Sequence, residues 1–453
     1  MVGAGLAGHC AALAASAAGA RVALLEKMPE CGGSTLTSGG SFAFAGTAQQ
    51  RSLGIDDSPE RLVEDLLRIS GGRADPALVK LYAGLQLDTH AWLEAQGVVF
   101  HKVSLSSNTS VPRTHPTLPG QVMDAMHARV LDCPAVTWFQ ETAAERLDPG
   151  SGRAWMVKAR ARGASRVLCA PAVVLASGGF ARNPAMVARY APSLARARAW
   201  GGAGNTGDGI VMAMVHGAAL ADMEYVAGTF GVALAHYPDL ESRPGDEVLL
   251  RMAMYRGAIA VNLGAERFAD ESLSYKTLGT RCLEQPGGVA FQVFDQPIMD
   301  QSARAPNLND FEDAFARGVI HRAATLADLA RAVDLSPERL AATVGRYNAA
   351  VTQGHDTDFG RATLGGGYGT PVRIDTPPYY ILPCCTALLA TYCGLRVDTD
   401  MRVLRGDGSP VPGLYAAGET VGGFHGAGYM SGSALGKAAI FGRVAGTGAA
   451  RDA

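Results

Sequence analysis

Apolar and polar residues follow two different spacings along this chain, and their order predicts alternating strands and helices. An alanine-rich run follows the glycines of GAGLAG (3–8) up to Ala18 and predicts a helix, and RVALLEK (21–27) predicts a short strand ending in an acid. Residues 58–99 keep helical apolar spacing, and RVLCAPAVVLASGGF (166–180) predicts a strand pair that ends in a buried strand and a glycine turn. GNTGDGIVMAMVHGA (204–218) predicts a glycine loop that opens a helix.

The segment from residue 226 to about 372 has a different character. GAIAVNL (257–263) and VAFQVFD (289–295) predict strands, and two helices are predicted at 325–333 and 336–354. LGGGYGTPVRIDTPPYY (364–380) is interpreted as a linker that returns the chain to the first domain. Strand, glycine turn and helix then recur from GLYAAGETVGG (413–423) onward. We therefore expect three parts, 1–225, 226–372 and 373–453, of which the first and last form one domain.

Composition narrows the class of protein. The chain has 453 residues, 48% of them hydrophobic and 18% charged, with a formal net charge of −2. These values predict a globular protein of two or three domains without the basic excess of nucleic-acid or membrane-surface binders. The chain contains no run of about 18 uninterrupted apolar residues, so no membrane span is predicted. The 56 glycines exceed the usual share and cluster, which indicates loops that approach a ligand closely.

The cysteines and the start of the chain give weaker information. None of the eight cysteines has CxxC or CxxCH spacing, so we predict no metal site. We expect the thiols to be reduced, with Cys384-Cys385 a structural pair of buried residues, and the protein to be cytoplasmic. The apolar start lacks the basic residues of a signal peptide. Only Met1 and Val2 precede the glycines, where a strand of several residues is expected, so we expect a truncation or a misplaced start codon.

The first glycine motif indicates a dinucleotide site. Gly3 and Gly5 permit close approach to a pyrophosphate, the following helix offers free N–H groups, and Glu26 can accept from ribose hydroxyls. Later glycine turns, including one beside Glu419, favour a long ligand that touches both chain ends, hence FAD rather than NAD. Glu419 is expected at the ribityl chain, with the helix after Ser433 directed at the flavin.

Several motifs together resemble those of the fumarate reductase/succinate dehydrogenase flavoprotein family, also called FAD-dependent oxidoreductase 2. They are VGAGLAG, LLEK, GGST with the following SGG, ASGGF, GNTGDG and GLYAAGE with FGRVAG. The resemblance spans nearly the whole chain. It implies an α/β fold, with a Rossmann-like FAD-binding domain built from both chain ends and an inserted α+β capping domain. Covalent-flavin members carry a histidine before the second glycine pair, and GGSTLTSGG has none, so FAD is expected to be non-covalent.

The resemblance also implies a set of cofactor contacts on this chain. They are Gly3, Gly5, Leu6, Ala7, Gly8, Glu26, Lys27, Gly32, Gly33, Ser34, Thr35, Ser38, Gly39, Gly40, Ala144, Ala176, Ser177, Gly178, Asp208, Gly418, Glu419, Ser433, Ala434 and Leu435.

Four positions depart from the pattern of the fumarate-reducing members. Their catalytic and dicarboxylate-binding arginines correspond to Tyr275 and Tyr429, and their two histidines correspond to Thr229 and a position near Ala390. Losing these cations disfavours a dicarboxylate, although Arg251 and Arg256 lie nearby in sequence and keep that alternative open.

Two phenols at these places are similar to the site of 3-ketosteroid dehydrogenases, and Y-x-S-G-x-x-L-G resembles the Δ4-(5α) type in particular. We therefore predict Tyr429, Tyr275 and Ser431 as catalytic, with His425 a weaker candidate and an N-cap role competing for Ser431. The expected reaction exchanges a hydride at flavin N5 and a proton through tyrosine across a carbon–carbon bond beside a carbonyl.

The expected substrate is a small, apolar, ketone-bearing molecule, and the external electron carrier is left unspecified. A fumarate- or dicarboxylate-type reductase and a flavin-binding protein without turnover remain alternatives.

Overall fold

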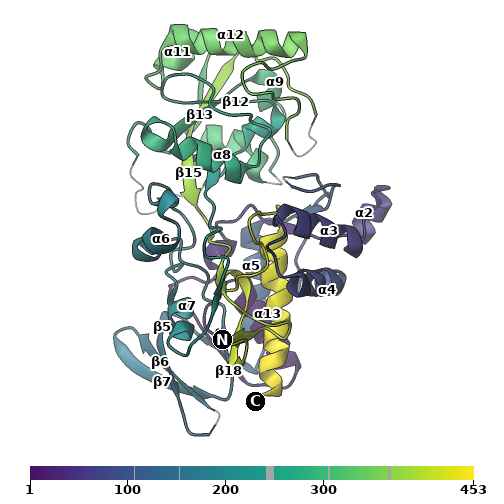
Figure 1. Ribbon diagram of the computed structural model, residues 1–453, viewed down its shortest axis with the longest axis vertical. Coiled ribbons are helices and arrows are strands. Elements are labelled where there is room, and N and C mark those ends of the chain that lie inside the picture. Colours follow the sequence, from purple (N-terminus) through teal and green to yellow (C-terminus); the bar gives the residue numbers. More distant parts are fainter. Residues whose placement is uncertain (107, 153, 241–248, 305–306, 366–368, 453) are drawn as a thin grey trace.

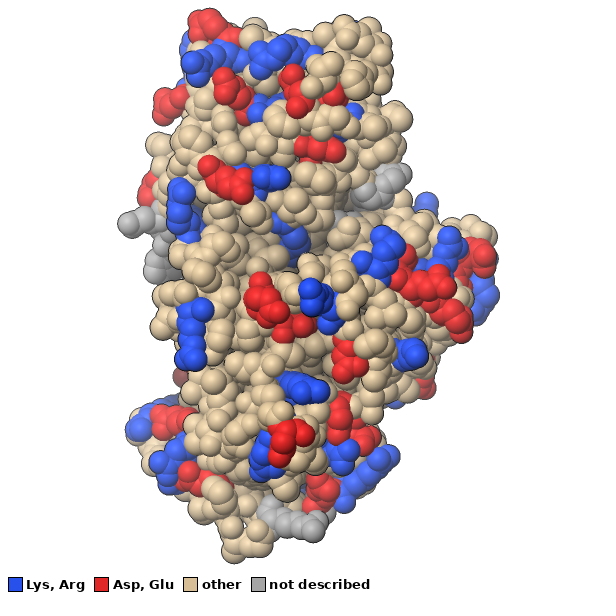
Figure 2. All heavy atoms as spheres, in the orientation of Figure 1, with Lys and Arg blue, Asp and Glu red and all other residues tan. Residues whose placement is uncertain are grey.

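The computed structural model describes residues 1–106, 108–152, 154–240, 249–304, 307–365 and 369–452. The molecule is elongated and has two parts, with both termini in the lower part in Figure 1. There the first helix, α1 (Leu6–Ala17), packs against the last, α13 (Ser433–Arg451), so the two ends of the chain share one domain. On the face shown in Figure 2, acidic and basic side chains are interspersed without one large patch of either sign.

A mostly parallel sheet forms the centre of the lower part. Strand β1 (Val22–Leu25) pairs in parallel with β4 (Val136–Phe139), and β18 (Pro410–Ala416) pairs in parallel with β8 (Val173–Leu175) and antiparallel with β17 (Arg402–Leu404). Val2 joins the two halves, because it bridges both Leu25 and Leu175. Its N–H donates to Val174 O at 2.9 Å, and its carbonyl accepts from Ala176 N at 2.8 Å. One residue therefore occupies the place of the central strand that the motif predicts.

Glycines let the two terminal helices cross closely. A Cβ on Gly446 would lie 2.1 Å from Ala11 O, and one on Gly442 would lie 2.5 Å from Ala7 O. Gly8 serves the turn before α1 in the same way, since its Cβ would lie 1.9 Å from Gly3 O. Backbone therefore contacts backbone where side chains would otherwise separate the helices.

The upper part is built on a largely antiparallel sheet. Its order is β11 (Thr229–Ala233), β15 (Tyr379–Leu388), β13 (Val289–Asp295) and β12 (Ile259–Val261), and β14 (His321–Ala323) and β9 (Arg198–Ala199) also pair with β15. Helix α8 (Tyr275–Leu283) packs on β11 and β15, while α11 (Leu326–Arg331) and α12 (Pro337–Gln353) lie at the far end of the molecule in Figure 1. Every residue of β13 is buried, which explains why five of its seven residues are apolar.

The remaining elements surround the central sheet or connect the two parts. The helices are α2 (Ala48–Ser52), α3 (Pro59–Ile69), α4 (Pro76–Ala95), α5 (Pro119–Leu131), α6 (Pro184–Tyr190), α7 (Asp208–Met214), α9 (Gln296–Met299) and α10 (Phe311–Ala316). The strands are β2 (Ser41–Ala43), β3 (Thr114–Pro116), β5 (Thr142–Pro149), β6 (Trp155–Ala161), β7 (Ala164–Ala170), β10 (Leu220–Ala221) and β16 (Gly394–Leu395). Strands β5, β6 and β7 form a separate antiparallel sheet at the lower end.

The expected α/β fold is confirmed, and helices and strands lie at most of the places that the spacing predicts. The pairing expected within 166–180 is wrong, because β7 pairs with β6 and β8 pairs with β18 in the central sheet. The domain boundaries at 225 and 372 stay predictions. The upper sheet includes β9, which precedes residue 225, and β15, which follows residue 372. Of the expected linker 364–380, residues 366–368 lie outside the described residues, and its last two residues begin β15. All eight cysteines are unpaired. Within the described ranges, no helix is both long and apolar enough to cross a membrane.

Candidate active site

One large cavity runs from the first glycine motif to the underside of the upper part. Its wall includes the turn before α1, the loop after β1, the turn after β18 and the start of α13, and Thr229 and Tyr275 reach it from the upper part. Residues from the first forty positions and from the last forty therefore meet in one space.

Glu26 is fixed at the end of β1 beside the first glycine turn. Its carboxylate accepts from Ala4 N and from Met28 N, both at 2.9 Å, and its side chain is buried. Gly3 has a φ of 98°, and a Cβ there would lie 2.5 Å from Ala176 O. A held carboxylate beside a glycine turn at a helix N-terminus fits the ribose and pyrophosphate of a dinucleotide.

A buried polar network joins three glycine loops at the other end of the cavity. Asn205 Nδ2 donates to Ser34 Oγ and to Glu419 Oε2, both at 2.8 Å, and Thr391 N donates to Glu419 Oε1 at 2.9 Å. Glu419 is thereby oriented at the cavity wall, which fits its expected place near the ribityl chain. Asn205 and Thr391 were missed by sequence reasoning, although Asn205 lies within the GNTGDG motif.

Nearly all the expected cofactor contacts line this cavity, so the residues present fit FAD. The exceptions are Gly8, Gly32 and Ser433. Gly8 serves backbone packing, and Gly32 has a φ of 117° at the turn before the second loop. The Ser433 hydroxyl donates to Met430 O at 2.7 Å and lies 3.1 Å from His425 Nε2, so it orders the start of α13.

The three predicted catalytic residues come together in the cavity. The Tyr275 hydroxyl lies 3.5 Å from Ser431 Oγ, and the rings of Tyr275 and Tyr429 meet edge to face with centroids 6.4 Å apart. The N-cap of α13 is Gly432, with a φ of 87°, so Ser431 does not serve as an N-cap. The glycine permits the turn that brings Ser431 beside the phenol of Tyr275.

Two further residues belong to this cluster and were missed. Tyr392 lies with its ring centroid 4.7 Å from that of Tyr429, and its φ of 60° is unusual for a residue other than glycine. Lys276 Nζ donates to Thr229 Oγ1 at 2.5 Å and lies 4.4 Å from the centre of the Tyr392 ring. The only sequence signals were the adjacency of Lys276 to Tyr275 and of Tyr392 to Ala390.

Burial sets the protonation of these groups. It lowers the pKa of Lys276 to about 7, opposed by the charge of Glu419. Burial raises the pKa of Tyr429 to about 12, a rise that hydrogen bonding from the backbone at Gly432 and Ala434 opposes. Burial also raises the pKa of Tyr275 and of Tyr392 above 10. The phenols therefore carry their protons at neutral pH, whereas Lys276 can change charge there.

The cations that fumarate reduction would use are arranged differently. Tyr275, Tyr429, Thr229 and Ala390 all line the cavity, whereas no arginine does among the described residues. Arg251 instead pairs with Asp313 at 2.7 Å. The Lys276 ammonium is bonded to Thr229, where the resemblance implies a histidine, so one positive group stays close to the expected position.

A second cavity adjoins the first and carries positive charge. Tyr392, His425 and Tyr429 line both spaces, and Arg68 and Lys276 line the second one. Burial lowers the pKa of His425 well below its usual value, and Lys437 and Lys276 lower it further, so this imidazole is neutral.

Comparisons with known proteins agree with this architecture. A family described as FAD binding domain matches residues 1–435. The chain is 33% identical to a fumarate reductase (cytochrome) from Shewanella frigidimarina, in an alignment that covers 100% of this chain and 76% of that protein. It is 31% identical to a urocanate reductase from Eggerthella lenta, in an alignment that covers 99% of this chain and 74% of that protein.

Solved structures extend the comparison. The open conformation of a flavocytochrome c3 fumarate reductase superposes with a TM-score of 0.85 at 29% identity, covering 100% of this chain and 77% of that one. A 3-ketosteroid-Δ4-(5α)-dehydrogenase from Rhodococcus jostii RHA1 gives 0.72 at 24% identity, covering 99% and 95%. The second likeness supports the fold alone.

Proposed function

The chain belongs to this FAD-binding family and is an oxidoreductase acting on CH–CH groups. We propose that it reduces the double bond of a small unsaturated acid, which has one carboxylate and an apolar or aromatic remainder. The relatives named for fumarate and urocanate support the acid-reductase alternative better than the ketosteroid-like interpretation. Membership of an enzyme family also removes the support for a flavin protein without turnover.

The observation that carries the proposal is the buried ammonium of Lys276, which lies among three phenol rings on the side of the second cavity. Its nitrogen lies 5.6 Å and 5.7 Å from the ring centres of Tyr275 and Tyr429, besides its contact with Tyr392. The ammonium complements one carboxylate, whereas no arginine among the described residues lines the cofactor cavity to give a second carboxylate a bidentate contact. The surrounding rings suit an aromatic or apolar substituent.

The residues divide the chemistry between binding and proton transfer. When bound, FAD supplies a hydride to one carbon of the double bond. Lys276 holds the carboxylate and polarises the double bond, and the Tyr429 hydroxyl gives its proton to the neighbouring carbon. The phenolate left behind is stabilised by N–H groups at the start of α13 and by the nearby ammonium. Tyr275 and Ser431 relay a proton from solvent to it, so that all three hydroxyls are protonated again.

A substrate panel tests the proposal. Holoenzyme reduced with dithionite is mixed anaerobically with cinnamate, urocanate, fumarate or 4-androstene-3,17-dione, and recovery of the visible flavin band is followed. Rapid recovery is expected with the two acids that carry a ring and slow recovery with fumarate. Fumarate as the best oxidant would contradict the one-carboxylate proposal.

An enone such as a ketosteroid is the second candidate. The hydroxyl pair of Tyr275 and Ser431 could polarise a ketone, and Leu250, Leu308 and Leu389 supply an apolar wall. Recovery of the flavin band with the androstenedione alone would favour this candidate.

A further inference from the structure

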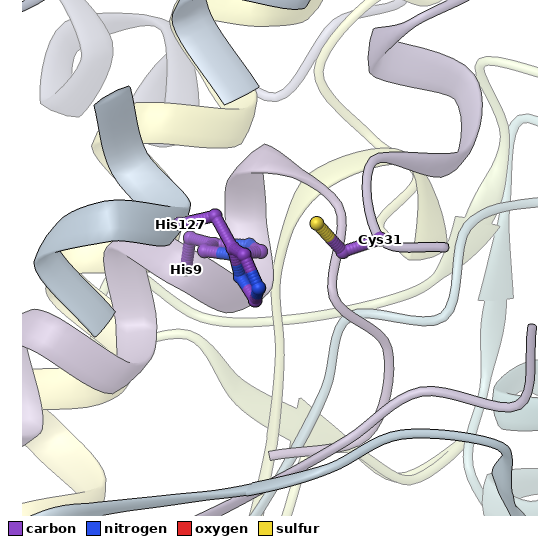
Figure 3. Close-up of side chains that lie close together, drawn as sticks. All are labelled: His9, Cys31 and His127. Atoms are coloured by element: carbon purple, nitrogen blue, oxygen red, sulfur yellow. The ribbon is translucent and has the colours of Figure 1, made fainter. Parts of the chain in front are cut away.

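Three side chains capable of metal coordination converge on the far side of the first glycine motif. His9 lies in α1, Cys31 in the loop after β1 and His127 in α5. Their ligand atoms all lie within 4.8 Å of one another, and Figure 3 shows the sulfur of Cys31 directed toward the side of the two imidazole rings. None of the three lines the cavity described above, so the proposed reaction does not use them.

The backbone already fixes one ligand in the correct form. His9 Nδ1 lies 3.0 Å from Gly5 O, and because a carbonyl only accepts, this nitrogen carries the proton. His9 Nε2 is then an unprotonated acceptor, 3.1 Å from His127 Nδ1. Metal-binding histidines commonly have this arrangement, with the second ring nitrogen donating to a backbone carbonyl.

The other two ligands are open to solvent, and their surroundings are negative. His127 and Cys31 are half-buried, so an ion could reach them, whereas the His9 ring is fully buried. Glu30 lies next to Cys31 in sequence, and Asp124 lies three residues before His127, so carboxylates flank these two ligands.

We propose that His9, Cys31 and His127 form a binding site for a borderline transition-metal ion of the Zn²⁺ class, with a water as fourth ligand. Zn²⁺ binds well to two imidazoles and one thiolate, whereas hard ions such as Mg²⁺ prefer oxygen ligands. Zinc–nitrogen bonds of about 2.0–2.1 Å place two tetrahedral nitrogens about 3.3–3.4 Å apart. The observed 3.1 Å separation of His9 Nε2 and His127 Nδ1 needs little change, and Cys31 moves inward.

Binding is accompanied by defined proton movements. The Cys31 S–H bond breaks and its proton leaves to solvent as the metal–sulfur bond forms. The proton on His127 Nδ1 is lost, and Nε2 of the same ring takes one up, so that Nδ1 can coordinate. The ion would then tie the second glycine loop to α1 and α5, which strengthens the wall of the FAD site without entering the reaction.

Zinc binding to the holoenzyme tests this site. Chelator-treated protein that retains its flavin is titrated with Zn²⁺ alone in a calorimeter, and bound zinc is measured after gel filtration. One ion per chain is expected. Cys31→Ser and His127→Gln should each weaken binding by about tenfold or more, whereas Cys169→Ser and His355→Gln, at exposed positions, should not.

Alkylation provides a readout that needs no variant. Zn²⁺ should slow the modification of Cys31 by iodoacetamide, measured by peptide mass spectrometry, and leave that of exposed Cys169 unchanged. Zinc that is not retained, binding that survives Cys31→Ser, or equal protection of both thiols would overturn the site. The histidine pair would then be a hydrogen bond within the fold only.

Discussion

The phenol of Tyr429 lies where one hydroxyl decides whether a proton can be delivered. Tyr429→Phe removes the hydroxyl and keeps the ring that packs against Tyr392 and Tyr275. We expect unchanged flavin content and a fall of about 10²–10⁴-fold in single-turnover flavin reoxidation. Tyr275→Phe should also slow flavin reoxidation. If both tyrosines serve one proton transfer, the fold-decrease in the double variant should be smaller than the product of the two single effects. Tyr190→Phe, remote on α6, is the matched control, and a near-normal rate in Tyr429→Phe would remove it from the mechanism.

Lys276 should impose a pH dependence on the capture of an acid. Its pKa is lowered to about 7, so the ammonium form is lost as the pH rises through that value. We expect kcat/KM for an anionic substrate to fall above pH 7. Lys276→Arg should extend activity to higher pH, and Lys276→Met should be weak at every pH. The exposed Lys80→Met is the control, and a profile unchanged in Lys276→Met would contradict the assignment.

The same residue should affect stability with the opposite trend. Because the folded-state pKa of Lys276 is below its ordinary value of 10.5, the unfolded chain binds an extra proton between about pH 7 and 10.5. The free energy of unfolding is therefore reduced as the pH falls through that range. Lys276→Met should raise Tm more at pH 7 than at pH 10, as measured by thermal unfolding.

The loop GGSTLTSGG leads us to expect releasable flavin, since it offers no histidine for a covalent bond. Acid precipitation should move all yellow colour to the supernatant, where FAD can be identified by chromatography. Colour retained in the pellet would show a covalent link from another residue.

At the residue scale, sequence motifs predict positions that require a particular residue type, and the structure places most of these positions along one cavity. The glycine turns and Glu26 follow from the space and polarity that a dinucleotide needs. The approach of Tyr275 to Tyr429 came from the resemblance alone, since nothing in their spacing brings them together. Lys276 and Tyr392 could not be predicted, because the burial that gives them their properties depends on the packing of α8 against distant segments.

At the scale of elements, the close crossing of α1 and α13 is the contact most sensitive to size. Gly446→Ala places a methyl carbon 2.1 Å from Ala11 O, and we expect a loss of about 1–3 kcal/mol in the free energy of unfolding and weaker flavin retention. Gly345→Ala is the control, because nothing lies within 4 Å of a Cβ there on α12. That change should stabilise by about 0.5–1 kcal/mol. Denaturant unfolding measures both, and equal effects would contradict the packing argument.

Strand β15 shows where element prediction fails. Its first residues fall in the expected linker, and Pro383 lies in its interior, which usually argues against a central strand. The proline still accepts from Leu234 N at 2.9 Å, and neighbouring strands and α8 bury the segment. Tertiary contacts therefore determine this strand, and local sequence does not reveal them.

At the scale of the whole molecule, the cofactor cavity depends on segments from both chain ends and from the upper part. FAD that binds only the folded chain should raise its stability by about 2.7 kcal/mol at a hundredfold excess over Kd. Flavin-stripped protein should therefore show a Tm that rises with added FAD. Riboflavin, which lacks the pyrophosphate and adenosine, should raise Tm much less. An equal rise with both ligands would show that the glycine motif and Glu26 contribute nothing.

The single-residue bridge at Val2 has a consequence for how the protein is made. The residues that complete its sheet on the far side belong to β18, some four hundred positions later. At about 5–20 residues per second, a ribosome needs roughly 20–80 s to reach them. During that time the nascent α1 has no α13 to cover it, and its apolar face is available to chaperones. Flavin loading must therefore follow translation, and a stalled nascent chain ending before residue 400 should emerge colourless however much FAD the cell contains.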